Sequence, residues 1–266
     1  MANPTPEAAP DFLSGEKFKG YEAAAQTFVD GSFAALRVDG KGFSRFTKQM
    51  GYAVPYDLDF MEIMDCVARD LLLLVDGSAF AYVQSDEISV IFTPTGSESA
   101  PQWWFGGKLQ KLTSISAARA SVSFLKAEYL RSGELVDALF DSRVLSLQSA
   151  EEAEQYLRWR RFDAQKNSVS MAASSKFSHR ELDGVSSRDR AALLAGTELE
   201  VLPDGFFNGR LIYRTKTQGL AWDSYAEKKI PVERTVVATS PATRDFVERA
   251  LPSLLENRSF TESSES

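Results

Sequence analysis

Two acidic motifs in the sequence follow apolar stretches, where catalytic side chains are often positioned. Asp39 comes directly after one apolar stretch, and Asp86 lies beside Glu87 between two further ones. If these stretches are neighbouring strands, the Asp39 and Asp86 carboxylates lie close together and repel unless a cation separates them. Oxygen ligands favour Mg²⁺, and the carbonyl of Gly40 can supply another. The pair therefore indicates a metal site for phosphoryl transfer, where two ions can act together.

Each motif is also typical of a plain surface turn, because Asp-Gly and Ser-Asp-Glu are common turn sequences. As a pair at the ends of apolar strands, they favour the metal site more than either does alone.

The first turn is rich in glycine and suits a phosphate-bearing ligand. Its glycines let backbone N–H groups approach a triphosphate as an anion nest. Lys41 can meet the phosphate charge, and the hydroxyls of Ser44 and Ser85 can donate hydrogen bonds. No stretch matches the G-x-x-x-x-G-K-[ST] phosphate loop. The predicted nucleotide-binding residues of this turn are Asp39, Gly40, Lys41, Gly42, Phe43 and Ser44.

The elements that must position these residues follow the order strand, helix, hairpin, helix, strand, helix. Apolar spacing predicts strands at 33–38, 79–83, 88–92, 143–147 and 232–238, and helices at 57–75, 107–130, 149–171 and 191–194. Asp57, the pair Ser149 and Glu152, and the pair Ser186 and Asp189 have the sequence features of helix caps.

This order predicts an α+β fold, with an antiparallel sheet and helices packed on one face, as in the palm of polymerases and nucleotide cyclases. We expect an N-terminal extension over 1–20 and a catalytic palm over 21–148. A helical and mixed part over 149–256 should pack on the palm, and 257–266 should form a disordered tail.

Composition restricts the class of protein without deciding it. The formal net charge of -7 counts against a nucleic-acid binder, although one basic face would be enough. No apolar run is long enough to cross a membrane, and the N-terminus lacks the features of a signal peptide. The single cysteine, Cys66, cannot form an internal disulfide, which fits a cytoplasmic protein.

Two aromatic segments have more than one interpretation. Trp159 lies within a basic stretch of Arg158, Arg160, Arg161 and Lys166, which is typical of either an RNA contact or a solvated helix. The segment 103–105, Trp-Trp-Phe, is compatible with a base-stacking lid, but core packing or a subunit interface is the more usual role.

Several motifs together resemble the tRNA(His) guanylyltransferase family, over about residues 20–215. The segment 37–43 resembles R-x-D-G-[RK]-G-F, and 84–87 matches Q-S-D-E. Supporting positions are Gly51, Pro55, Asp57, Lys111, the F-D-S-R segment 140–143, Trp159, Arg160 and Asp163.

The resemblance implies a palm with two Mg²⁺ ions that uses ATP and GTP on the 5′ end of a tRNA. Asp39, the Gly40 carbonyl and Asp86 would hold Mg²⁺, with Glu87 assisting. The turn 39–44 with Ser85 and Asp86 would hold the nucleotide, and Lys111 and Arg143 would contact phosphates. A homotetramer is also implied.

One segment departs from the eukaryotic pattern. Where those enzymes have H-I-N-N-L-Y-N, this chain has residues 165–171, with Gln165 at the histidine position and only Asn167 retained. This resembles the bacterial and archaeal guanylyltransferase-like branch, associated with template-dependent 3′-to-5′ addition and tRNA 5′-end repair. A palm-type cyclase or small-nucleotide synthase acting on free nucleotides, and a non-catalytic nucleotide-binding module, are the alternative functions.

Overall fold

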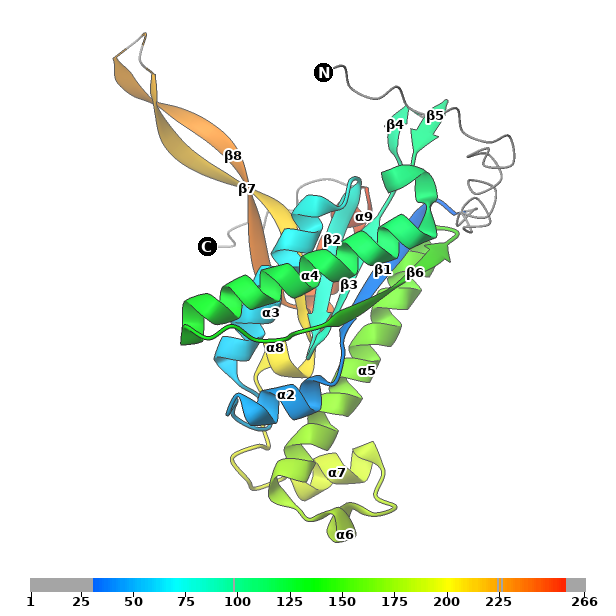
Figure 1. Cartoon of the computed structure of the whole chain (residues 1–266), viewed down its shortest axis with the longest axis vertical. Helices are drawn as coiled ribbons and strands as arrows, with labels where there is room; N and C mark the ends of the chain where they lie inside the picture. Colours follow the sequence, from blue (N-terminus) through cyan, green and yellow to red (C-terminus); the bar gives the residue numbers. More distant parts are fainter. Residues whose placement is uncertain (1–30, 98, 224, 226, 257–266) are drawn as a thin grey trace, which may run out of the picture.

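The computed structural model describes residues 31–97, 99–223, 225 and 227–256 (Figure 1). In this part of the chain, a six-stranded sheet has the order β6-β1-β3-β2-β7-β8, and all its neighbours are antiparallel. Its strands are β1 (Phe33–Gly40), β2 (Ser78–Gln84), β3 (Glu87–Phe92), β6 (Phe140–Leu147), β7 (Arg210–Asp223) and β8 (Lys228–Pro241). A separate short pair is formed by β4 (Thr95–Ser97) and β5 (Ala100–Gln102).

Helices cover both faces of the sheet. On one face lie α3 (Leu58–Leu74) and α4 (Leu109–Ser132), and on the other lie α5 (Ala150–Lys176) and α9 (Arg244–Leu255) (Figure 1). The α+β palm class is confirmed, but the expectation that helices lie on one face is wrong. Every residue of β2 and β3 is buried, so both faces of these strands need apolar cover.

The predicted helix caps are present. The Asp57 carboxylate accepts a hydrogen bond from the Phe60 N–H at 3.1 Å, and the Ser149 hydroxyl accepts one from the Glu152 N–H at 3.3 Å. Ser186 likewise caps α7 (Ser187–Leu193). Helix α5 continues past the predicted end at residue 171 to Lys176. Each cap depends on residues only three positions apart, which is why the caps could be predicted from the sequence.

Other elements were not predicted from the sequence. They include α2 (Phe43–Gln49), the 3₁₀ turn η2 (Trp104–Gly107), α6 (His179–Leu182), α8 (Asp204–Phe207), β7 and α9. The predicted strand at 232–238 is the middle of the longer β8. Trp104 is buried and Trp103 packs edge-on to Phe92, so both pack in the core and do not form a lid.

The predicted part 149–256 completes the sheet begun by the palm, because β7 pairs with β2 through registers such as Phe80 with Tyr213. The predicted extension over 1–20 and tail over 257–266 lie outside the described residues. Among the described helices, none has the length and apolar character needed to cross a membrane.

Candidate active site

The end of β1 and the β2–β3 turn bring the two predicted acids together. In the sheet register Asp39 is opposite Glu87 on β3, and the Gly40 N–H donates to the Asp86 carbonyl at 3.1 Å. Ser85 has a left-handed backbone, with φ at 48°, in the tight turn that carries Asp86. Asp39 and Asp86 line the same cavity. The predicted proximity of the two carboxylates is therefore a feature of the fold.

The electrostatic environment of these acids favours a cation. Burial raises the pKa of Asp86, and the nearby Asp39 carboxylate raises it further. Burial also raises the pKa of Asp39, with a second contribution from Asp141, its register partner on β6, while Arg37 and other arginines oppose the shift. Two carboxylates that lose hydration beside each other are stabilised in their charged form by a bound cation.

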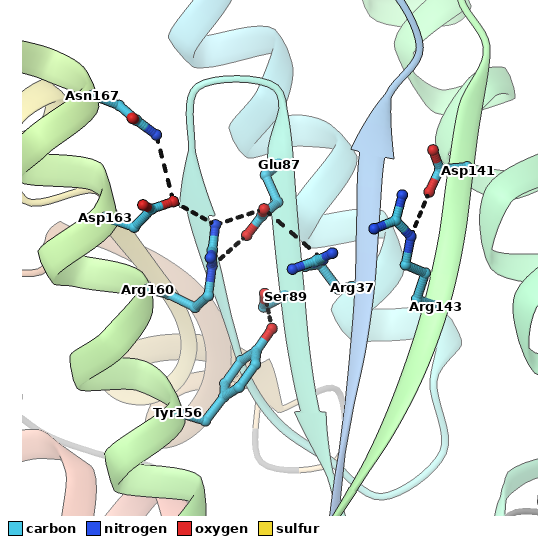
Figure 2. A network of polar contacts seen from close by, with 9 residues as sticks. All are labelled: Arg37, Glu87, Ser89, Asp141, Arg143, Tyr156, Arg160, Asp163 and Asn167. Carbon is cyan, nitrogen blue, oxygen red and sulfur yellow. Dashed lines mark hydrogen bonds and ion pairs between the residues drawn. The ribbon is translucent and has the colours of Figure 1, made fainter. Parts of the chain in front are cut away.

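Glu87 belongs to a buried ion-pair network (Figure 2). The Arg160 guanidinium donates from Nε and Nη2 to the two Glu87 carboxylate oxygens, at 2.8 and 2.7 Å. Arg37 Nε lies 4.0 Å from the same carboxylate, and Asp163 accepts from Arg160 at 3.2 Å. Burial raises the pKa of Glu87, and the two arginines oppose that shift. Both Glu87 carboxylate oxygens thus accept hydrogen bonds from Arg160 of α5.

The basic stretch on α5 is not one continuous surface. Arg160 is only 5% exposed, and Arg161 donates to the Ala242 carbonyl at 2.6 Å. Arg158 is exposed and pairs with Glu154, while Lys166 lies over the Phe162 ring. The expectations of a basic RNA face and of a solvated face are both wrong for Arg160, because this side chain is the buried link between α5 and the β2–β3 hairpin.

Two cavities meet at Asp86. The smaller, of about 400 Å³, lies between the hairpin turn and α5 and is lined mainly by polar side chains, including Asp39 and Asn167. The larger, of about 630 Å³, is bounded by α2, the start of α3, α5 and α8, and includes the aromatic pair Tyr56 and Phe206, with ring centroids 5.2 Å apart. Both are lined by Ser85, Asp86, Met171 and Ser174.

Fewer residues of the glycine-rich turn line the two cavities than the sequence predicted. Ser44 lines the larger cavity, as does the edge of the buried Phe43 ring, which packs among Phe124 and other core rings. A Cβ at Gly40 would lie 2.4 Å from the Phe43 ring, so this contact requires glycine there. Lys41 and Gly42 are exposed and line neither cavity.

The prediction that backbone N–H groups of this turn form an anion nest is wrong for Gly40 and Lys41, because both N–H groups already donate hydrogen bonds within the protein. The Lys41 N–H donates to the Leu139 carbonyl at 2.8 Å, and the Gly40 N–H is bonded to Asp86. These bonds join the turn to the residue just before β6 and to the hairpin, so the backbone here holds Asp39 in place.

The two candidate phosphate contacts lie in different places. Arg143 is exposed on the edge strand β6, 3.4 Å from Asp141 (Figure 2), and its charge partly opposes the rise in the pKa of Asp39. Lys111 is exposed on α4, 5.7 Å from the Phe105 ring centroid, and lines neither cavity. Arg143 also lines neither cavity, so of the two residues only Arg143 interacts electrostatically with Asp39, and neither contacts the acid pair.

The donors available to a metal are all oxygens. In the described ranges, no group of three or more His, Cys, Asp or Glu side chains is arranged to hold a metal ion. The candidate set is instead the Asp39 and Asp86 carboxylates with the Gly40 carbonyl. Such a set, with both carboxylates partly desolvated, fits Mg²⁺, which binds proteins through few carboxylates and keeps several waters.

The strand order, the helices and the paired acids at the end of a central strand define a palm-type protein. The family model of tRNAHis guanylyltransferase matches residues 15–148, half of the sequence, and the chain belongs to this family. The tRNA(His) guanylyltransferases of the family are nucleotidyltransferases.

Relatives and solved structures agree with this assignment. The probable tRNA(His) guanylyltransferase of Mus musculus is 27% identical over 140 residues, 52% of this chain and 45% of the mouse protein. The chain spans about half the length of the curated relatives that it matches.

A bacterial tRNA(His) guanylyltransferase (Thg1)-like protein in complex with ATP is 33% identical, with a TM-score of 0.69 over 75% of this chain and 87% of that one. A second such structure, in complex with GTP, is 26% identical with a TM-score of 0.69, covering 91% and 98% of the two chains. The predicted resemblance, including its similarity to the bacterial branch, is confirmed.

Proposed function

We propose that this chain is a Mg²⁺-dependent nucleotidyltransferase that adds nucleotides to the 5′ end of tRNA in the 3′-to-5′ direction. The observation that carries the proposal is the position of Asp86, which stands beside Asp39 and between two cavities of different character. A reaction between two substrates needs both reacting ends at the same acids, and two cavities that meet there suit it.

Asp39, the Gly40 carbonyl and Asp86 would hold the metal, with two ions expected from the resemblance. When bound, Mg²⁺ would neutralise phosphate charge at the reacting centre. The protein's part is to keep the two carboxylates at one point of the sheet, through the Gly40–Asp86 bond and the β1–β3 register. Glu87 acts by positioning, because both its oxygens are bonded to Arg160.

The larger cavity is the proposed nucleotide site. Tyr56 and Phe206 offer apolar surface for a base, while Ser44 and Ser85 offer hydroxyls near Asp86. ATP and GTP are the proposed nucleotides because they are bound in similar bacterial structures. Arg143 is the proposed phosphate contact nearest to Asp39, and both Arg143 and Lys111 would reach a phosphate only outside the two cavities.

The substrate choice that we propose is template-dependent addition to tRNA, as in the guanylyltransferase-like branch. Gln165, which replaces the histidine of the eukaryotic pattern, donates from Nε2 to Asn208 Oδ1 at 2.9 Å. Its amide is therefore used to join α5 to the segment before β7. The resemblance also predicts a homotetramer, which a mass measurement in solution would test.

The deciding experiment maps RNA 5′ ends after incubation with Mg²⁺ and all four nucleoside triphosphates. Addition at the 5′ end, dependent on RNA and lost with a chelator, is expected. A cyclic or oligomeric product formed from GTP alone would contradict the proposal and identify a cyclase or small-nucleotide synthase, which the net charge of -7 also suits.

A further inference from the structure

The larger cavity has an aromatic wall whose two rings come from distant parts of the chain. Tyr56 directly precedes the cap of α3, and Phe206 lies on α8, with the two rings tilted by 39° and their centroids 5.2 Å apart. Helix α8 is one turn long and follows Pro203, whose side chain has no group that can cap it. So short a helix does not hold a side chain in place by itself. A contact from outside α8 must therefore fix Phe206 relative to Tyr56.

Arg210, the first residue of β7, joins α8 to α3 through its guanidinium group. Its Nη1 donates a hydrogen bond to the Gly205 carbonyl on α8 at 3.1 Å, and its Nη2 donates one to the Met61 carbonyl on α3 at 3.2 Å. Its Nε donates to Asp65 Oδ1 at 2.6 Å, one turn further along α3. Because the guanidinium is planar and rigid, these three bonds fix α8 relative to α3.

The two carbonyls that Arg210 binds lie close to the two rings in the sequence. Gly205 directly precedes Phe206, and Met61 lies in the first turn of α3, which begins two residues after Tyr56. The backbone of α8 also packs closely on the Arg210 side chain, since a Cβ at Gly205 would lie 3.2 Å from the Arg210 Cδ. The Arg210 side chain therefore sets the distance between the segments that carry the two rings.

The burial of this ion pair needs a reason other than stability. Arg210 is only 6% exposed, and burial raises the pKa of Asp65 while the Arg210 charge opposes that shift. Removing two charges from water offsets most of their attraction, so a buried pair is weak evidence for stabilisation. Arg210 lines the larger cavity, but each of its three nitrogens already donates to the protein. It is therefore suited to act through its neighbours and not by contacting a ligand.

We propose that Arg210 is a positioning residue for the nucleotide base, because it holds Phe206 beside Tyr56 and the two rings contact the base. This inference rests on the proposed function, in which the larger cavity is the nucleotide site, and it deepens that function. Helix α8 is also attached on its other side, where Gln165 of α5 donates to Asn208 at 2.9 Å. Loss of the Arg210 contacts should thus displace Phe206 without releasing the whole segment.

The first test compares a ligand that has a base with one that has none. Calorimetry measures the binding of GTP and of inorganic triphosphate, each with Mg²⁺ and without RNA. Arg210→Met should weaken GTP binding about tenfold, the effect of losing one ring that stacks on a base, and should leave triphosphate binding unchanged. Equal weakening of both ligands would overturn the proposal, because Arg210 would then act on the phosphates through its charge.

The second test asks whether Arg210 acts through Phe206. Phe206→Ala should weaken GTP binding by a similar factor, since it removes the ring itself. Adding Arg210→Met to Phe206→Ala should then cause no further loss, because the ring that Arg210 positions is already absent. Losses that multiply in the double variant would show that the two residues act independently, and the positioning role would be wrong.

A matched control separates positioning from general destabilisation. Arg119→Met breaks another ion pair of α3, with Asp70 at 3.2 Å, and neither of these residues lines either cavity. This variant should keep the wild-type affinity for GTP, and a tenfold loss here as well would overturn the proposal. If Arg210→Met does not fold, the double variant Asp65→Leu with Arg210→Met removes both charges, a change that is often neutral for stability. It should show the same selective loss of GTP affinity, and wild-type affinity would contradict the proposal.

These measurements can fail separately from the proposed function, because binding requires neither RNA nor turnover. If Arg210→Met selectively weakens GTP binding but no RNA receives a nucleotide, the positioning role stands and 5′ addition is wrong. If wild type adds nucleotides and the Arg210 variants bind GTP as tightly as wild type, the positioning role alone is wrong. In the extension reaction, the KM for GTP should rise in Arg210→Met while kcat stays unchanged, since the acids are untouched.

Discussion

Arg160 holds both carboxylate oxygens of Glu87, and this contact joins helix α5 to the hairpin that carries Asp86. The two residues are 73 positions apart in the sequence, and both are buried. The pair therefore fixes the distance between the acids and the helix that forms the far wall of the smaller cavity.

Breaking this pair should destabilise the protein strongly. Arg160→Met leaves the Glu87 carboxylate buried without its partner, which should cost about 3–5 kcal/mol of unfolding free energy. The double variant with Glu87→Gln should recover part of that loss, because no unpaired charge remains. Urea unfolding of the two single variants and the double variant measures the coupling, and simple additivity would mean that the pair makes no net interaction.

The same variants distinguish a positioning role of Glu87 from direct chemistry. If Glu87 acts through Arg160, Glu87→Gln should lower kcat modestly and leave the dependence of rate on Mg²⁺ concentration unchanged. A shift in the Mg²⁺ concentration needed for half-maximal rate would instead make Glu87 a metal ligand.

Replacing either central acid should abolish nucleotide addition without unfolding the protein. Asp39→Ala and Asp86→Ala each remove a proposed metal ligand, and we expect rates to fall by at least ~100- to 1,000-fold. Near-wild-type rates in either variant, with Mg²⁺ present, would contradict the metal assignment.

The difference in stability between Asp86→Asn and wild type should depend on pH. Burial and Asp39 raise the pKa of Asp86, so its charged form destabilises the folded state near neutral pH. Without Mg²⁺, Asp86→Asn should therefore melt at a higher temperature than wild type. The difference should shrink as the pH falls through the raised pKa, where wild type becomes neutral too. Adding Mg²⁺ should stabilise wild type and leave the variant unchanged, and equal responses would show that Asp86 binds no metal.

RNA binding should depend on exposed cations and not on Arg160. Arg143→Glu and Lys166→Glu change exposed side chains and should weaken RNA binding, reducing the slope of affinity against salt by about one for each lost phosphate contact. Nucleotide binding should be unaffected by Lys166→Glu. Arg244→Glu, an exposed change on α9, is the control. Unchanged RNA affinity in both test variants would show that neither Arg143 on β6 nor Lys166 on α5 contacts RNA.

Substrate choice should follow pairing with a template base. A tRNA that lacks its 5′ nucleotide should be refilled according to the base opposite, whatever its anticodon. The assay extends truncated tRNAs that combine two anticodons with two opposing bases. Extension that follows the anticodon and ignores the opposing base would instead indicate dedicated tRNA(His) guanylylation.

A buried carboxylate far from the acid pair should make stability depend on pH. Burial alone would raise the pKa of Glu128 on α4, but hydrogen bonds from Arg131 and Tyr52 outweigh it and hold the pKa below its usual value of 4.5. Its stabilisation is therefore present above that value and is lost as the pH falls toward the lowered pKa. Glu128→Gln should lose about 2 kcal/mol near neutral pH and less in acid, measured by urea unfolding. A constant difference would contradict this.

Local signals account for what the sequence predicted. The strand before Asp39, the hairpin around Asp86 and the caps at Asp57 and Ser149 each depend on a few adjacent residues. The meeting of Asp39 and Asp86 could be predicted for the same reason, since both stand at strand ends.

Features that depend on distant partners were missed. Arg160 is one of several arginines on a charged helix, and nothing nearby in sequence marks it as the partner of Glu87. The cavity wall formed by Tyr56 and Phe206 joins segments about 150 residues apart, as the numbering shows. Strand β7 was missed because residues 214–219 are mostly polar, which follows from their having only β8 as a neighbour.

That arrangement of β7 has a consequence for hydrogen exchange. Only Arg210 to Tyr213 pair with β2, whereas the pairing of β7 with β8 continues out to Asp223 and Lys228, as a ribbon that projects from the sheet (Figure 1). A two-stranded ribbon is only marginally stable in water. Its outer amides should thus exchange with deuterium through local opening, orders of magnitude faster than those of the first four residues, which exchange only when the sheet itself opens.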